Sequence, residues 1–166
     1  MQVRNKTDTS TILDRVILRE VPRENGLRAW EALLRAHATL LRQLALEIAE
    51  ETGTTLGDFD VLAQLANAGG QLRMTELAEK VFSSRSGLTR RIDKLEAEGL
   101  IDRTGAEGDG RGVNVKLTEK GVERLKAIAP VHLRGVSRHF VGRLSDQELA
   151  TLERALNKVI VDCKFG

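Results

Sequence analysis

The residues best suited to chemistry lie between Ser84 and Lys94, where hydroxyl side chains alternate with cations. From Arg85 to Lys94 there are four basic residues and one acid, a net charge of +3. Guanidinium groups bind phosphates, and a single arginine can contact both O6 and N7 of guanine. Hydroxyls add hydrogen bonds to phosphates or base edges. This combination predicts contacts with the backbone and bases of duplex DNA.

Helical periodicity sorts this segment into two faces. At about 100° per residue, a helix over 84–98 places Leu88, Ile92 and Leu95 on one stripe, which we expect to face the core. The opposite face carries the polar residues. We predict DNA contacts from Ser84, Arg85, Ser86, Thr89, Arg90 and Lys94. Asp93 is the one acid there, and we expect it to pair with Arg90 or Arg111.

The surrounding pattern predicts a winged helix-turn-helix. Thr75 is the expected N-cap of a preceding short helix that ends near residue 82, and Gly99 is expected to end the helix over 84–98. Alternating residues over 113–117 predict a strand that pairs with 100–103. The glycine-rich tip between these two strands presents Arg111, which can reach into a narrow minor groove. In this motif the second helix enters the major groove.

Longer helices are predicted before and after the winged helix-turn-helix. Apolar residues at helical spacing run over 26–51, with Gly53 just past the end. Thr118 is expected to cap a helix that Pro130 should kink or interrupt, and a Ser145-to-Glu148 capping box opens the last helix. The predicted fold is mainly α, with a winged helix-turn-helix lobe, a two-stranded β wing and a helical dimerisation region. The predicted division has three parts. An N-terminal extension over 1–22 is partly disordered or forms a short helix, a helical dimerisation region covers 23–54 and 118–166, and a DNA-binding lobe covers 55–117.

Several motifs together resemble the MarR family of bacterial transcriptional regulators. They are Leu77-Ala78-Glu79-Lys80-Val81, the run from Ser84 to Glu96, Gly99-Leu100-Ile101, Asp109-Gly110-Arg111 and Leu117-Thr118-Glu119-Lys120-Gly121. The resemblance covers roughly residues 26–163. It implies a homodimer on a palindromic operator, with the first helix and the last two helices at the dimer interface. Repression is the expected effect.

The resemblance also implies a pocket for a small phenolic or aromatic ligand. Trp30, Leu34 and His37 on the first helix, with Asp60 on the second, are the candidate ligand-binding residues. In some relatives an arginine directly follows this tryptophan and pairs with a ligand carboxylate, but here that position is Glu31. The alternatives are that Trp30 fills the core and that His37 is a satisfied core or interface histidine.

Composition excludes other classes of protein. The net charge of +2 rules out a uniformly basic surface, and 3% aromatic residues argue against a stacking platform for single strands. One cysteine and three dispersed histidines give no disulfide framework or metal motif, and we expect no cofactor and no catalytic residues. No apolar run reaches the length of a membrane span, so we expect a cytoplasmic protein. The alternatives to a DNA-binding regulator are a winged-helix interaction module without DNA binding and, last, an enzyme.

Overall fold

The computed structural model describes residues 16, 20, 24–81, 84–105 and 112–162. The chain divides into two compact units, residues 1–41 and 42–166. The predicted helix before Pro22 lies mostly outside the described residues. So do the hairpin tip with Arg111, the thiol of Cys163 and the side chain of Arg85.

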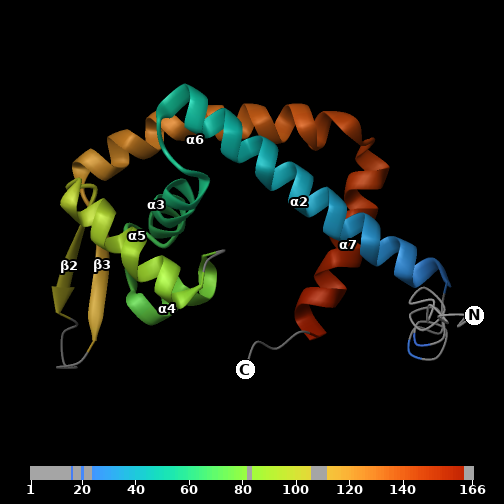
Figure 1. The fold of residues 1–166 in the computed structure, drawn as a ribbon, viewed down its shortest axis with the longest axis horizontal. Helices are drawn as coiled ribbons and strands as arrows, with labels where there is room; N and C mark the ends of the chain where they lie inside the picture. The colour runs from blue at the N-terminus through green and yellow to red at the C-terminus, as the bar shows by residue number, and fades with distance from the viewer. Residues whose placement is uncertain (1–15, 17–19, 21–23, 82–83, 106–111, 163–166) are drawn as a thin grey trace, which may run out of the picture. The chain divides into compact units, whose positions relative to one another are not determined.

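The described chain is mainly helical, with one small sheet (Figure 1). Its elements are α2 (Glu24–Thr52), α3 (Leu56–Asn67), β1 (Gln71–Arg73), α4 (Met74–Lys80), α5 (Arg85–Ala97), β2 (Ile101–Gly105), β3 (Val113–Leu117), α6 (Glu119–His139), the 3-10 turn η1 (Val141–Arg143) and α7 (Asp146–Asp162). A long helix, three short helices, a hairpin and two long helices follow in the predicted order. The mainly α winged helix-turn-helix fold is confirmed.

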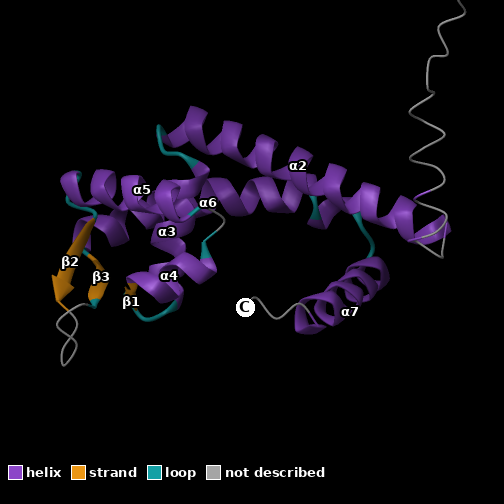
Figure 2. Ribbon diagram, turned by 60° about the horizontal axis from the view of Figure 1, so that its bottom comes forward, coloured by secondary structure: helices purple, strands orange, loops and turns teal. Residues whose placement is uncertain are grey.

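The sheet has three antiparallel strands in the order β1-β3-β2, one more than the predicted two-stranded wing (Figure 2). Leu72 of β1 pairs with Val115 of β3, which pairs with Arg103 of β2 on its other side. Strand β1 runs directly into α4, so Arg73 precedes the helix and its N–H donates to the Glu76 carboxylate at 2.9 Å. The predicted N-cap, Thr75, is therefore wrong, because it lies inside the first turn of α4.

The core of residues 42–166 forms where α5 and the sheet pack on α3 and α6. The predicted inner stripe of α5, Leu88, Ile92 and Leu95, is buried as expected. Its buried partners in the same cluster are Ile48, Val61, Leu62, Leu65, Leu77, Val81, Leu100, Ile101, Val115, Leu117, Ile128 and Val131. Burial of this stripe holds one face of α5 inward and leaves the other available for contacts.

The start of α6 is packed closely against the end of α5. Thr118 is the N-cap, as predicted: its Oγ1 accepts from the Gly121 N–H at 3.0 Å and donates to the Gly99 carbonyl at 2.8 Å. A Cβ atom on Gly121 would lie 2.0 Å from the Leu100 carbonyl oxygen. The glycine is thus required by the approach of two backbones.

Helix α6 continues through Pro130 to His139, so the predicted interruption at the proline is wrong. Ile128 and Val131 are buried on either side of the proline. We attribute the continuity to this buried apolar contact, which offsets the one helical hydrogen bond that proline cannot donate.

The second half of α6 packs on the end of α2. Gly135 makes room for Leu44 and Glu47, whose side-chain atoms would lie 2.6 Å from a Cβ at that position. His139 Nε2 lies 2.6 Å from the Glu47 carboxylate. The hydrogen bond with His139 is the main cause that lowers the pKa of Glu47.

Along the described stretches, no helix is both long and apolar enough to cross a membrane.

Replacing Gly121 by Ala is expected to lower the free energy of unfolding by about 3 kcal/mol, because the new methyl group clashes with the Leu100 carbonyl. Urea denaturation measures the change. Gly105→Ala is the control, since a Cβ there meets nothing within 4 Å. Equal stability of the two variants would contradict the close approach.

Candidate nucleic-acid interface

The outward face of α5 carries the predicted contact residues. Ser84 is its N-cap, with Oγ accepting from the Gly87 N–H at 3.2 Å. Ser86, Thr89 and Arg90 are exposed, opposite the buried stripe. In the described part of the chain, no ion pair involves Arg90. A cation with no ion-pair partner among the described residues, on the exposed face of a short helix, is suited to bind an external anion.

The inner border of α5 is held by a buried carboxylate. Asp58 of α3 is only 1% exposed. Arg91 Nη1 donates to its Oδ1 at 2.8 Å, and Lys94 Nζ donates to its Oδ2 at 2.7 Å. Arg91 also donates to Oγ1 of Thr55, the N-cap of α3, at 3.1 Å. Two cations one helical turn apart therefore dock α5 onto the start of α3.

Electrostatics of this site keep Asp58 ionised. Burial alone would raise the pKa of Asp58, but hydrogen bonds from Lys94, Arg91 and Thr55 outweigh it and lower the pKa below the ordinary 3.8. The Arg91 guanidinium lies over Gly57, where a Cβ would come within 2.5 Å of it. The absence of a side chain at residue 57 thus makes room for the ion pair.

A second contact ties the wing to the same helix. Arg103 of β2 shares a sheet face with Leu72 and Val115, so its side chain extends toward α5. Its guanidinium hydrogen-bonds Asp93 and lies 3.3 Å from the Glu96 carboxylate. The predicted partner of Asp93 was Arg90 or Arg111. Among the described residues, its partner is Arg103.

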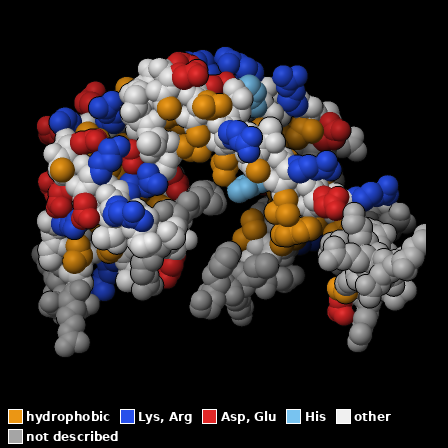
Figure 3. Space-filling view, viewed as in Figure 1, with side chains coloured by type: hydrophobic (Ala, Val, Ile, Leu, Met, Phe, Trp, Pro, Cys, Tyr) orange, Lys and Arg blue, Asp and Glu red, His pale blue; other side chains and the backbone are white. Residues whose placement is uncertain are grey.

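The surface around this site mixes both signs of charge. In Figure 3, Lys and Arg side chains over the lobe are interspersed with acidic ones. This agrees with the small net charge of the chain. Any attraction to DNA must therefore come from the local placement of cations, not from the overall charge.

Two residues that hold α5 in place, Asp58 and Arg103, were not predicted from the sequence. Asp58 has the appearance of an ordinary acid in the first turn of a helix, and Arg103 that of an exposed strand residue. Their partners are far enough along the chain that spacing does not reveal them. Lys94 was predicted to contact DNA. Its ammonium group is bound to Asp58, so it serves the docking of α5 in the described structure.

The candidate ligand residues are divided between the two units. Trp30, Leu34 and His37 are exposed on α2, with Trp30 55% accessible. Asp60 lies on α3, where its carboxylate accepts from Gln64 at 3.3 Å. A pocket that joins them stays a prediction.

His132, which was not among the predicted site residues, lies on α6 against α3. The ring of His132 stacks on Phe59 with centroids 4.5 Å apart. Burial lowers the pKa of His132, although Asp60 opposes the shift. Its Nδ1 is buried without a hydrogen-bond partner among the described residues.

The sequence and fold of this chain are similar to those of known proteins. The sequence model of the MarR family matches residues 52–112. The crystal structure of AbsC, a MarR family transcriptional regulator from Streptomyces coelicolor, is 32% identical and covers 83% of this chain and 93% of AbsC, with a TM-score of 0.75. This chain belongs to the MarR family.

Two further relatives are also transcriptional regulators. Sco3205 from Streptomyces coelicolor, a MarR family transcriptional regulator solved in complex with DNA, is 26% identical and covers 86% of this chain and 93% of Sco3205, with a TM-score of 0.78. The HTH-type transcriptional regulator PecS of Dickeya dadantii is 30% identical over 104 residues, 61% of this chain. That alignment spans 62% of PecS, less than two thirds of its length. The relatives are transcriptional regulators.

We expect Asp58→Asn to lower the free energy of unfolding at neutral pH by about 3 kcal/mol, the scale for breaking a buried ion pair. Arg91 and Lys94 would lose their shared carboxylate. Chemical denaturation measures the loss. The control is Asp102→Asn, an exposed acid on β2, expected to cost less than about 0.5 kcal/mol.

The difference between wild type and Asp58→Asn should depend on pH. Because folding lowers the pKa of Asp58 from 3.8, its stabilisation is complete above that value and is lost as the pH falls through the lowered pKa. Unfolding free energies measured from neutral pH downward should therefore converge in acid. A constant difference at every pH would exclude the ionised carboxylate as the cause.

Proposed function

We propose that this MarR-family chain is a sequence-specific double-stranded DNA-binding transcriptional regulator that acts as a homodimer and represses its targets. The observation that carries the proposal is the exposed face of α5 around Arg90, on a helix that ion pairs with Asp58 and Arg103 hold in place. A fixed helix can present side chains to a groove without losing further conformational freedom on binding.

On DNA, α5 would enter the major groove. Arg90 would read a guanine or clamp a phosphate, while Ser84, Ser86 and Thr89 would bind phosphates or base edges. Arg85 and Arg111 complete the proposed contact set, with Arg111 directed to the minor groove. Lys94 is assigned to docking α5 rather than to reading DNA, because Asp58 already binds its ammonium group.

A dimer is supported by the apolar surface of α7. Leu149, Leu152 and Leu156 are only half-buried in the single chain, and Val159 and Ile160 are 57% and 63% exposed. These residues recur at helical spacing, which gives one long stripe that the described chain covers only in part. A second copy would bury it. Two-fold symmetry would then place the two α5 helices about 34 Å apart, one turn of DNA.

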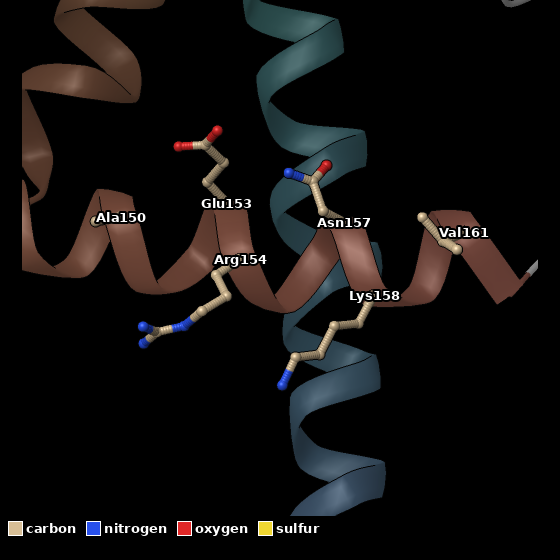
Figure 4. Close-up of a pocket in the computed structure, with 6 residues that line it drawn as sticks. All are labelled: Ala150, Glu153, Arg154, Asn157, Lys158 and Val161. Atoms are coloured by element: carbon tan, nitrogen blue, oxygen red, sulfur yellow. The ribbon is translucent and has the colours of Figure 1, made fainter.

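The opposite face of α7 has a different character. A hollow of about 710 Å³ there is lined by residues of α7 alone (Figure 4). Glu153, Arg154, Asn157 and Lys158 surround it. An open surface lined by one helix and four polar side chains is a poor site for a small aromatic molecule, which needs apolar walls on several sides.

We also propose that a small phenolic or aromatic ligand releases the DNA. Trp30 and Leu34 would supply its apolar contacts, and His37 and Asp60 would supply hydrogen bonds. Such a ligand acts only if it binds the DNA-bound and DNA-free arrangements with different affinity. A thermal-shift screen of phenols and aromatic acids tests the idea, because a specific binder raises Tm with dose.

Replacing Arg90 by Ala should weaken operator binding by 1–3 kcal/mol, or roughly 5- to 150-fold in Kd, if the arginine reads a guanine. Gel-shift titration with the gene's own promoter region measures the change. Lys126→Ala is the matched control, since Lys126 is an exposed cation on α6 paired with Glu123.

Unchanged affinity of the Arg90→Ala variant would exclude Arg90 from the interface. Wild-type affinity should also fall steeply with salt, because phosphate contacts release counterions. A wild-type protein that fails to shift promoter DNA would instead favour the winged-helix interaction module.

An acidic residue in the apolar stripe of α7 should dissociate the dimer. We expect Ile160→Asp to sediment as a monomer in analytical ultracentrifugation, because the carboxylate would be buried without a partner. Arg154→Asp places a carboxylate on the opposite face of α7, in the lining of its hollow, and should stay dimeric. If both variants form dimers with the same dissociation constant, the proposed interface is wrong.

A further inference from the structure

A second, smaller cavity lies behind α5, on the side away from its exposed face. It has a volume of about 190 Å³. The turn after α2, the end of α5 and the start of α6 enclose it, through Thr54, Lys94, Glu98, Lys120 and Arg124, with Asp58 at one wall. No part of this cavity involves the candidate ligand residues on α2 or the DNA-contact face.

The cations in its wall are not balanced by acids. The Asp58 carboxylate is already shared between Arg91 and Lys94, and Glu98 lies 3.8 Å from Lys94. Lys120 Nζ donates to the Glu98 backbone carbonyl at 2.7 Å, and Arg124 Nη1 to the Thr52 carbonyl at 3.5 Å. Within the ranges that the structure describes, neither Lys120 nor Arg124 pairs with a carboxylate.

The size of the cavity limits what it can hold. Pockets for drug-sized molecules are about 300–1,000 Å³, well above this volume. Since a water molecule takes about 30 Å³ of liquid, the space suits a compact ion of a few heavy atoms. Two unpaired cations on one side of α6, at positions i and i+4, favour an anion with more than one negative oxygen.

We propose that this cavity binds a small oxyanion of the phosphate class, held by Lys120 and Arg124 and adjacent to Lys94. The ion competes with Asp58 for the Lys94 ammonium and so weakens the docking of α5 on α3. If the chain binds operator DNA as proposed above, occupancy of the cavity lowers its affinity for the operator. The site shares no residue with the proposed aromatic pocket and takes a smaller ligand.

The test of binding uses no DNA. Tm of the full chain is measured in inorganic phosphate and in sodium chloride of equal ionic strength. We expect a saturable rise with phosphate over chloride in the wild type. The Lys120→Gln, Arg124→Gln double variant should lose that excess, while its amides can still donate to the Glu98 and Thr52 carbonyls. Lys126→Gln, a charge loss on the same helix, should keep it.

Equal phosphate effects in all three proteins would show general stabilisation by an excluded salt and would overturn the site. So would the absence of a rise in the wild type. Circular dichroism and Tm in chloride check that the double variant folds. If it does not, the single Arg124→Lys variant, which keeps the charge, must retain the phosphate effect, and Arg124→Gln must reduce it.

The consequence for DNA is measured separately. At constant ionic strength, phosphate should raise the Kd for operator DNA more in the wild type than in the double variant. Equal responses would overturn the coupling. If the double variant instead loses about two units of the slope of log K against log salt, the two cations contact DNA phosphates and the cavity proposal is wrong. Failure to bind DNA at all would leave the phosphate-binding test intact.

Discussion

The placement of α5 depends on the buried carboxylate of Asp58. A carboxylate that is 1% exposed must be fully hydrogen-bonded to stay ionised, and Arg91 and Lys94 provide those bonds. Both cations come from α5, so satisfying the acid also fixes the position and rotation of that helix. The buried apolar stripe alone would hold α5 inward with less control of its rotation, since apolar contact is not directional.

The sheet holds the same helix through a second set of ion pairs. Arg103 connects β2 to Asp93 and Glu96, and the Leu100 backbone packs directly against the start of α6. The third strand, β1, adds a pairing between the entry to α4 and the centre of the wing. Because these contacts link α5, the three strands and the start of α6, the lobe is expected to move as one body, and a ligand that affects α3 can change the orientation of α5.

Local patterns predicted the order of the described helices and the caps at Ser84, Thr118 and Ser145, although not the cap of α4, because caps depend on neighbouring residues. Ser84 and Thr118 are N-caps, and Ser145 forms its capping box with Glu148, each within a few residues. The Asp58–Arg91 contact joins residues 33 apart, and the Arg103–Asp93 contact depends on which face of β2 points inward. Three-residue β1 is too short for an alternating pattern to appear. The predicted DNA face follows from one helix, whereas a ligand pocket needs several elements whose packing no spacing rule gives.

Pro130 makes α6 easier to bend at one position, although the helix is continuous from Glu119 to His139. Proline has no N–H, so the carbonyl of Lys126, four residues earlier, has no helical donor at that position. The first part of α6 is joined to Leu100, and the last part is joined to α2 through Gly135 and His139. A helix missing one bond between two anchored ends bends there at lower cost than elsewhere. Strain applied at either end is therefore concentrated in a single turn beside α3.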